Sequence, residues 1–281
     1  MVSAVPAANG TGGTLFVVST PIGNLGDLSA RAVEVLRTVS AILAEDTRHS
    51  RILCERHELH TALIAYHEHN EAKATPGLVA RLVAGESLAL ISDAGTPLVS
   101  DPGARLVRAA IDAGVKVSPV PGASALLAAL AGAGLPTERF TFFGFLERKG
   151  GERTRAIAEI AALGHTAILY EAPGRIAATL NDLAASGAAE RDAVVARELT
   201  KTYEEFRRGT VAELAAYYGA TEPRGEIVLL IAGAVTAPLD EEALRARARS
   251  LRAAGQTPRD VTQALLADGV PRNLAYRLAH E

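Results

Sequence analysis

The chain has 281 residues, a formal net charge of −3, 48% hydrophobic residues and 22% charged residues, a composition that is typical of a globular protein and excludes a largely disordered chain. No apolar run is long enough to cross a bilayer, so we expect no membrane partner. The single cysteine, Cys54, excludes an intrachain disulfide framework and is typical of a reducing, cytoplasmic location. Residues 1–13 have neither the basic start nor the apolar core of a secretory signal, and we expect a flexible leader there.

The first part of the chain alternates short apolar strands with amphipathic helices. A strand is predicted over residues 15–19, followed by a turn with Gly23 and Gly26, a helix, and a strand over residues 41–44 that ends in Glu45 and Asp46. An acidic pair about 22 residues after a glycine turn resembles a dinucleotide site, but this turn has the spacing Gly-x-x-Gly and lacks a third glycine. A nicotinamide-binding Rossmann site is therefore only weakly indicated.

Four histidines lie close together in the next stretch, namely His57, His60, His67 and His69. Alternation along a strand places His67 and His69 on one face, but no third ligand has a suitable spacing. We therefore expect no metal site.

Three helix starts are predicted from a proline at the first helical position, one of them at Thr257-Pro258. One helix is expected to start at Thr75-Pro76 and end at Gly85, and another is expected to start at Asp101-Pro102, with Asp101 as its N-cap, and end near Gly114.

The most informative stretch is an apolar strand predicted over residues 87–92 and the loop that follows it. A short run that is almost entirely apolar predicts a strand buried on both faces of a parallel sheet. Open α/β sheets bind ligands beyond the carboxyl ends of their strands, and this loop, rich in Gly, Pro and short polar residues, follows such an end. The loop is predicted to hold a ligand, and the alternative is a plain connector.

A second candidate ligand segment follows the strand predicted over residues 115–120. After Pro121-Gly122, a helix of only Ala, Leu and Gly is predicted over residues 125–133, and we expect it inside the protein. Free backbone amides at its start place Ser124 and Ala125 where they can meet a ligand. The small residues 131–136 predict a hinge between two domains.

Beyond this hinge, strands and helices continue to alternate. Residues 140–145 contain four of the six phenylalanines of the chain, which predicts a strand that is either core or a ligand wall. Residues 147–153 contain three basic and two acidic residues and indicate either a solvated turn or a contact for a polyanion. Residues 203–208 and 226–231 predict an antiparallel finish to the second sheet.

The last segment has the size of a helix-turn-helix unit, with helices predicted over residues 241–254, 258–267 and from 272 onward. From Arg245 to Arg277 there are seven arginines and two acidic residues, which indicates either phosphate binding or an ordinary solvated surface. The predicted fold class is thus α/β, with a leader over residues 1–13, α/β domains over 14–132 and 133–236, and a helical, helix-turn-helix-like tail over 237–281.

Six segments occur in an order that resembles the tetrapyrrole methylase superfamily, and within it the branch that methylates ribosomal RNA of the small subunit. They are residues 19–27 (STPIGNLGD), 44–48 (AEDTR), 92–97 (SDAGTP), 121–124 (PGAS), 143–146 (FGFL) and 170–173 (YEAP), and residues 272–277 (RNLAYR) also resemble the C-terminal end of that branch. The resemblance covers roughly residues 14–233. It implies two α/β domains with S-adenosylmethionine in the cleft between them, a homodimer, and 2'-O-methylation of a cytidine (position 1402) in 16S ribosomal RNA.

The resemblance also implies which residues bind the cofactor. Residues 95–99 match the cofactor loop, Ser124 and Ala125 match a second segment, and Pro21 and Tyr170 border the same cleft. The implied set is Pro21, Asp93, Gly95, Thr96, Pro97, Val99, Ser124, Ala125 and Tyr170. Thr96 stands where tetrapyrrole-modifying relatives have aspartate, which points away from porphyrinoid substrates. The alternatives are a methyltransferase of the same superfamily for a tetrapyrrole or a modified protein side chain, and a non-catalytic ribosome-binding module.

Methylation of a ribose hydroxyl calls for a base within hydrogen-bond reach of that hydroxyl. We expect Glu45 or Asp46 in this role, while Glu171, Glu198 and Lys201 remain alternatives at other strand ends. Basic side chains suited to the RNA are Arg48, Arg148, Lys149, Arg175, Arg272 and Arg277.

Overall fold

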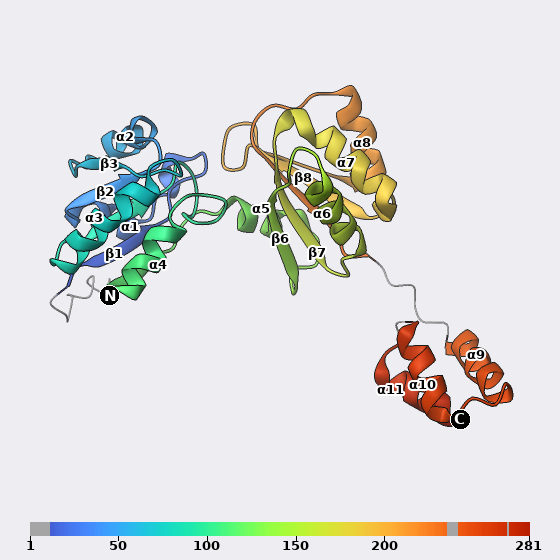
Figure 1. Cartoon of the computed structure of the whole chain (residues 1–281). Coiled ribbons are helices and arrows are strands. Elements are labelled where there is room, and N and C mark those ends of the chain that lie inside the picture. The colour runs from blue at the N-terminus through green and yellow to red at the C-terminus, as the bar shows by residue number, and fades with distance from the viewer. Residues whose placement is uncertain (1–11, 235–240, 269) are drawn as a thin grey trace. The chain divides into compact units, whose positions relative to one another are not determined.

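The computed structural model describes residues 12–234, 241–268 and 270–281 (Figure 1). The chain divides into two compact units, Met1–Ala234 and Val235–Glu281. Most of the predicted leader and the predicted boundary between residues 236 and 237 lie outside the described residues. Gly13, the last residue of that leader, donates its backbone N–H to the carbonyl of Leu82 at 2.8 Å.

The first sheet has five parallel strands in the order β3-β2-β4-β1-β5. Its strands are β1 (Thr14–Val18), β2 (Ala41–Ala44), β3 (Leu63–Ala65), β4 (Leu88–Ile91) and β5 (Lys116–Val120). Its helices are η1 (Leu25–Asp27), α1 (Ala30–Thr38), α2 (Thr47–Arg56), α3 (Glu71–Val83) and α4 (Ala104–Asp112). One face packs against α1 and α2, and the other packs against α3 and α4 (Figure 1).

Strand β4 lies between β2 and β1, and all four of its residues are buried. Leu88 and Leu90 belong to the core under α3 and α4, whereas Ala89 and Ile91 belong to the core under α1 and α2. The prediction of a strand buried on both faces is confirmed, and it brings the loop after β4 to the middle of the sheet edge.

The helix starts predicted at Thr75-Pro76 and Asp101-Pro102 are both wrong. Helix α3 begins at Glu71, and Pro76 lies inside it, because a turn held by hydrogen bonds of the Asn70 side chain to His67 N and Ala65 O starts the helix earlier. Helix α4 begins at Ala104 with Gly103 as its N-cap, so Asp101 does not cap it. A glycine is required at 103, because φ is +129° and a Cβ atom there would lie 2.5 Å from Cδ2 of Leu90.

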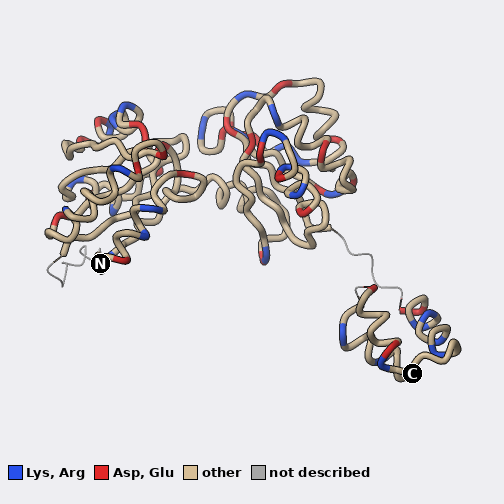
Figure 2. Tube along the Cα trace, viewed as in Figure 1, with Lys and Arg blue, Asp and Glu red and all other residues tan. Residues whose placement is uncertain are grey.

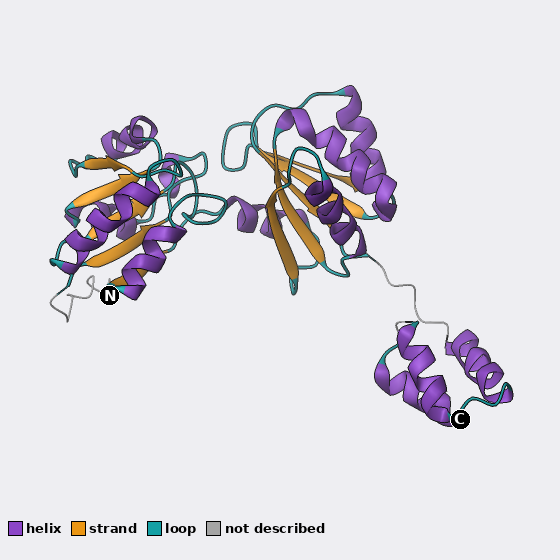
Figure 3. Cartoon of the chain, in the orientation of Figure 1, coloured by secondary structure: helices purple, strands orange, loops and turns teal. Residues whose placement is uncertain are grey.

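The second sheet is mixed, with the strand order β6-β7-β10-β8-β9. Figure 3 shows the strands in orange and the helices around them in purple. Its strands are β6 (Phe140–Phe145), β7 (Thr166–Glu171), β8 (Asp192–Arg197), β9 (Glu205–Thr210) and β10 (Ile227–Ile231). Its helices are α5 (Ala125–Ala133), α6 (Gly151–Ala162), η2 (Pro173–Arg175), α7 (Ile176–Leu183), η3 (Ala184–Ala188) and α8 (Val211–Ala220). β6 pairs in parallel with β7, and β10 and β9 pair antiparallel with their neighbours, which confirms the antiparallel finish.

One face of this sheet is covered by α6, α7 and α8, while α5 packs on the other. Ala129, Leu130 and Ala133 of α5 are buried there, but Leu127 is 54% exposed. The expectation that this apolar helix lies entirely inside is therefore wrong for this chain by itself. Although the sequence places the hinge at residues 131–136, α5 already packs on the second sheet before that segment.

The second unit contains three helices, α9 (Glu241–Ala253), α10 (Pro258–Ala267) and α11 (Arg272–His280), around a small apolar core. Thr257 and Asp260 form a reciprocal capping box at the start of α10, and Pro258 occupies the first helical position, as the sequence predicts. Within the described residues, no helix has the length and apolar character needed to span a membrane.

Candidate active site

The loops after β1 and β4 meet at the carboxyl edge of the first sheet. Thr20 N donates to Gly95 O at 2.8 Å, and Gly95 N donates back to Thr20 O at 3.1 Å. Gly95 has a φ of +80°, and a Cβ atom there would lie 3.3 Å from Cγ2 of Ile22. A glycine at 95 thus allows the two loops to lie against each other.

Thr96 fixes a third loop to the same edge. Its hydroxyl lies 3.0 Å from Ser19 Oγ and donates to Ala123 O at 3.2 Å. The Thr96 side chain is therefore tied to the protein itself. Thr96 positions the segment that leads into α5.

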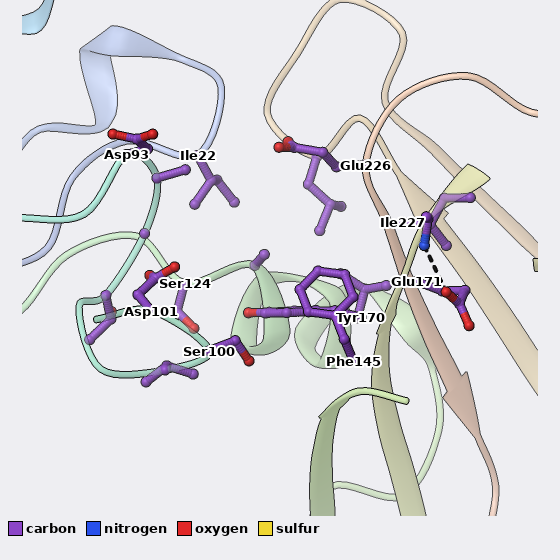
Figure 4. Close-up of a pocket in the computed structure, with 18 of the residues that line it drawn as sticks. Ile22, Asp93, Ser100, Asp101, Ser124, Phe145, Tyr170, Glu171, Glu226 and Ile227 are labelled. Carbon is purple, nitrogen blue, oxygen red and sulfur yellow. Dashed lines mark hydrogen bonds between the residues drawn. The ribbon is translucent and has the colours of Figure 1, made fainter. Parts of the chain in front are cut away.

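These loops line one side of a cavity of about 560 Å³, and the second sheet lines the other (Figure 4). Seven of the nine predicted cofactor residues line it, namely Asp93, Gly95, Thr96, Val99, Ser124, Ala125 and Tyr170. Pro97 is not part of the lining, and Pro21 lines a neighbouring cavity of about 60 Å³. Glu45, one of the two predicted bases, also lines the main cavity.

The sequence-based set omits several lining residues, namely Ile22, Ser100, Asp101, Phe145, Leu199, Gly225, Glu226, Ile227 and Val228. Phe145 comes from the phenylalanine-rich strand, and it is 57% exposed beside Tyr170, with their ring centroids 5.5 Å apart. Of the two interpretations of that strand, core or ligand wall, the second therefore applies to its last residue, Phe145. Leu199 and Gly225 lie in loops that carry no motif recognised in the sequence.

Two loops that face the cavity, the loop after β4 and the loop after β8, contain residues with left-handed backbone conformations. Leu98 and Ser100 have φ values of +74° and +68°, and Glu198 and Thr200 have values of +51° and +65°. Such conformations are costly for residues with a side chain and persist where the surroundings impose them. Thr200 is held on two sides, because its N–H donates to Glu204 Oε2 at 2.7 Å and its hydroxyl accepts from Asn24 N at 3.1 Å.

The charged residues that line the cavity are all acidic, namely Glu45, Asp93, Asp101, Glu171 and Glu226. Burial raises the pKa of Glu45, and the neighbouring Asp93 raises it further. Burial also raises the pKa of Asp101 to about 6 against a hydrogen bond from Ser92, with Glu45 and Asp93 adding to the rise. An acidic, partly buried cavity of this kind favours a positively charged ligand.

Asp46, the other predicted base, has a structural position instead. It is the N-cap of α2, accepts from Arg48 N at 2.8 Å, and forms an ion pair with the Arg48 guanidinium at 3.0 Å. The hydrogen bonds from Arg48 lower the pKa of Asp46 to about 2, which makes it a weak base. Asp46 is not among the residues that line the cavity.

Two of the alternative bases are engaged as well. Glu171 accepts from Thr179 Oγ1 at 2.6 Å and from Arg175 Nε at 3.1 Å, and its side chain is fully buried. Burial alone would lower the pKa of Lys201, but hydrogen bonds to Glu198 and Glu226 outweigh it and raise the pKa. Lys201 therefore stays charged.

The predicted RNA-binding residues fall into two groups. Arg148, Lys149 and Arg272 are exposed, and none of them forms an ion pair with another described residue. Arg48 is bound to Asp46, but its side chain is 90% exposed. Arg175 turns inward and donates to Leu146 O at 2.6 Å as well as to Glu171, so little of its guanidinium is left for a phosphate. Arg277 is paired with Glu241 at 2.9 Å.

Among the described residues, no group of three or more His, Cys, Asp and Glu side chains is arranged to hold a metal ion.

Residues 14–215 match the family model described as Tetrapyrrole (Corrin/Porphyrin) Methylases. The chain belongs to the tetrapyrrole methylase family. The Synechocystis sp. protein named Ribosomal RNA small subunit methyltransferase I is 47% identical to it over 273 residues, which cover 96% of this chain and 98% of that protein. The Pseudomonas aeruginosa protein of the same name is 47% identical over 273 residues, covering 95% and 96%.

Solved structures of this family share the fold. A cobalt precorrin-4 methyltransferase matches with a TM-score of 0.61 at 17% identity, over 82% of this chain and 98% of its own. Uroporphyrin-III C-methyl transferase from Thermus thermophilus, complexed with S-adenyl homocysteine, matches with a TM-score of 0.57 at 20% identity, over 79% of this chain and 97% of its own. At these identities the likeness concerns the fold alone.

Proposed function

We propose that this chain transfers a methyl group from S-adenosylmethionine to the ribose 2'-hydroxyl of cytidine 1402 in the 16S ribosomal RNA of the small subunit. The observation that carries the proposal is the likeness, at 47% identity over nearly the full length, to proteins named Ribosomal RNA small subunit methyltransferase I. The acidic cavity at the carboxyl edge of the first sheet supports it. It lies at the place where α/β sheets bind their ligands.

The cavity fits the proposed cofactor in size and charge. About 560 Å³ is within the usual range of roughly 300–1,000 Å³ for small-molecule sites. Its carboxylates suit a ligand that carries a sulfonium and an ammonium group, and its apolar residues Ile22, Val99 and Leu199 suit an adenine ring. We propose that the seven predicted residues in the lining bind this cofactor, which supplies the methyl group and leaves as a neutral thioether.

The protein's own part in the reaction is to align the attacking hydroxyl, to exclude water and to accept a proton. Ordered loops joined by the Thr20–Gly95 hydrogen bonds can provide the alignment. Of the two acids predicted as the base, Glu45 lies in the cavity lining and Asp46 does not.

We propose that exposed basic side chains bind the RNA backbone. Arg48, Arg148 and Lys149 are exposed on the α/β unit, and Arg272 and Arg277 are on α11. Phosphate contacts of this kind orient a protein on RNA without reading its sequence. We also propose a homodimer, in which a second copy would cover Leu127 and Phe140, which are 54% and 41% exposed. We propose a cytoplasmic location, of which a single cysteine is typical.

Two measurements test the function. Calorimetry with S-adenosylmethionine distinguishes an enzyme from a ribosome-binding module that no longer binds the cofactor. Transfer of a labelled methyl group to purified small subunits that lack the modification, followed by mapping of the labelled nucleotide, then tests the substrate. Label in a porphyrinoid or a protein with none in the RNA would overturn the proposal.

A further inference from the structure

Five carboxyl groups line the cavity, and three of them are already engaged. Asp93 accepts the backbone N–H of Asp46 at 3.0 Å, Glu171 is bound to Arg175 and Thr179, and Glu226 accepts from Lys201 Nζ at 3.0 Å. Glu171 and Glu226 are thus paired with basic side chains, and Asp93 is held by a backbone N–H. Glu45 and Asp101 remain, and neither forms an ion pair with another described residue.

The loop after β4 is built to hold Asp101 at the cavity. Leu98, Ser100 and Gly103 on either side of it have positive φ values, and α4 starts only after Gly103. Asp101 therefore has no capping role, although its Asp-Pro sequence suits one. Figure 4 shows Asp101 beside Ser124 on one side of the cavity, with the hydroxyl end of Tyr170 turned toward that side from the second sheet.

Asp101 and Glu45 differ in the groups around them. The backbone of Asp93 opposes the rise in the pKa of Glu45, whereas the side chain of Ser92 opposes the rise in the pKa of Asp101. The Asp101 carboxyl lines the cavity and has no ion pair to another described residue, so it can accept a proton from a ligand there.

We propose that Asp101 is the catalytic base of the methyl transfer and that Glu45 and Asp93 act as positioning residues beside it. This inference rests on the proposed function. The O–H bond of the ribose hydroxyl breaks and its proton passes to a carboxylate oxygen of Asp101, while the oxygen electron pair forms the new O–CH₃ bond. The C–S bond of the methyl donor breaks, its electron pair stays on sulfur, and Asp101 afterwards releases the proton to solvent.

The charged and titratable groups around Asp101 come from three elements. Glu45 follows β2, Asp93 comes after β4, and Tyr170 is the second-last residue of β7. The two neighbouring carboxylates repel the charge on Asp101, and proton transfer relieves that repulsion. A base that titrates near pH 6 is still mostly deprotonated at neutral pH yet binds the proton well, which is the condition for efficient general-base catalysis.

Three variants of the full chain test the assignment. Asp101→Asn keeps the shape and removes the basic oxygen, Glu45→Gln tests the other candidate, and Asp112→Asn makes the same change at the exposed end of α4 as a control. We expect Asp101→Asn to lower kcat on purified small subunits by about 10²- to 10⁴-fold. Its Kd for S-adenosylhomocysteine, which lacks the sulfonium charge, should stay within about threefold of the wild type, as should all properties of Asp112→Asn.

The pH profile and chemical rescue separate a base from a merely structural group. In the wild type, kcat/KM should fall about tenfold per pH unit below about 6, and this limb should vanish in Asp101→Asn. In Asp101→Ala, added formate should restore part of the rate. Without any ligand, the difference between the melting temperature of Asp101→Asn and that of the wild type should increase, in favour of the variant, as pH rises.

Three results would overturn the assignment. They are Asp101→Asn with a rate within threefold of the wild type, a pH limb that persists in that variant, and loss of the limb in Glu45→Gln alone. Wild-type protein that binds S-adenosylhomocysteine but transfers no methyl group to small subunits would instead overturn the proposed function, and the base with it.

Discussion

Replacement of Asp101 by Asn should stabilise the protein, and the gain should depend on pH. The folded state raises the pKa of Asp101 from 3.8 to about 6, chiefly through burial. A raised carboxyl pKa contributes stability that is fully present below the unfolded pKa and is lost as pH rises through the folded one. Above pH 6, wild-type protein therefore bears the cost of a buried charge that the amide variant does not have.

The size of the effect follows from the shift. About two pKa units at 1.36 kcal/mol each correspond to about 3 kcal/mol, and partial solvent screening of a half-buried carboxyl reduces this to about 1–2 kcal/mol. For a unit of this size, such a gain raises the melting temperature by about 2–8 °C. Because the unfolded carboxyl is already ionised at pH 5 and the folded one is not, the gain at pH 5 should be about half of that at pH 8.

Thermal unfolding of ligand-free protein at pH 5, 6, 7 and 8 measures this difference. The variant Asp112→Asn, which changes an exposed ion pair with Arg108, should track the wild type across the range. An Asp101→Asn protein that melts at or below the wild-type temperature at pH 8, or whose gain does not change with pH, would show that Asp101 is not the buried carboxylate inferred here.

Three further variants test other parts of the site. Gly95→Val should abolish binding of S-adenosylhomocysteine in calorimetry and cost about 1–2 kcal/mol of stability, because φ is +80° there; unchanged affinity would reject the loop assignment. Truncation before Pro238 should weaken capture of the RNA in filter binding more than cofactor affinity, since the α/β part is a compact unit, and equal losses would argue against an RNA role for the helical unit. Joint replacement of Arg148 and Lys149 by Ala should reduce the salt slope of RNA binding by about 1–2 with no effect on cofactor affinity; an unchanged slope would remove that segment from the RNA surface.

Much of the first sheet follows from local pattern alone. Strand β2 has the predicted bounds, and β4 differs by one residue at each end, because strands buried on both faces need continuous apolar runs that are visible in the sequence. The ligand loop after β4 follows from the same logic. Its dense Gly and Pro content marks it, and its place at the sheet edge is a consequence of strand direction.

The error at Asp101 has a different cause. The Asp-Pro pair satisfies the local rule for a helix start, but the approach of Gly103 to Leu90 fixes where the chain can turn into α4. That distance joins residues that are 13 positions apart and depends on how the loop folds back over β4. Because of this tertiary contact, Gly103 is the N-cap of α4, and Asp101 lines the cavity instead of capping the helix.

The far wall of the cavity was not predictable either. Leu199 reaches the cavity because the next residue, Thr200, is hydrogen-bonded to Asn24. Gly225 reaches it because the absence of a side chain leaves room for Glu198, whose Oε1 lies 2.1 Å from where a Cβ atom of residue 225 would be. These contacts join segments that are far apart in the sequence, and the contact of Thr200 with Asn24 joins a loop of the second sheet to a loop of the first. No local pattern in either loop indicates them.

The helical unit shows how ion pairs change an estimate made from charge counts. Asp268 pairs with Arg247, and Glu241 and Glu281, which lie outside the counted segment, pair with Arg245 and Arg277. Figure 2 marks these charges. The remaining arginines without an ion pair to a described residue are Arg249, Arg252, Arg259 and Arg272.

This pairing sets an upper limit on the salt dependence that the helical unit can contribute. Four arginines bound to single-stranded phosphates contribute a slope of about 3 in log K against log salt, whereas all seven arginines between Arg245 and Arg277 would contribute about 5. Truncation before Pro238 should therefore lower the measured slope by about 3 or less. A loss near 5 would mean that RNA displaces Glu241, Asp268 and Glu281 from their arginines, and no change in slope would mean that the unit binds no phosphates.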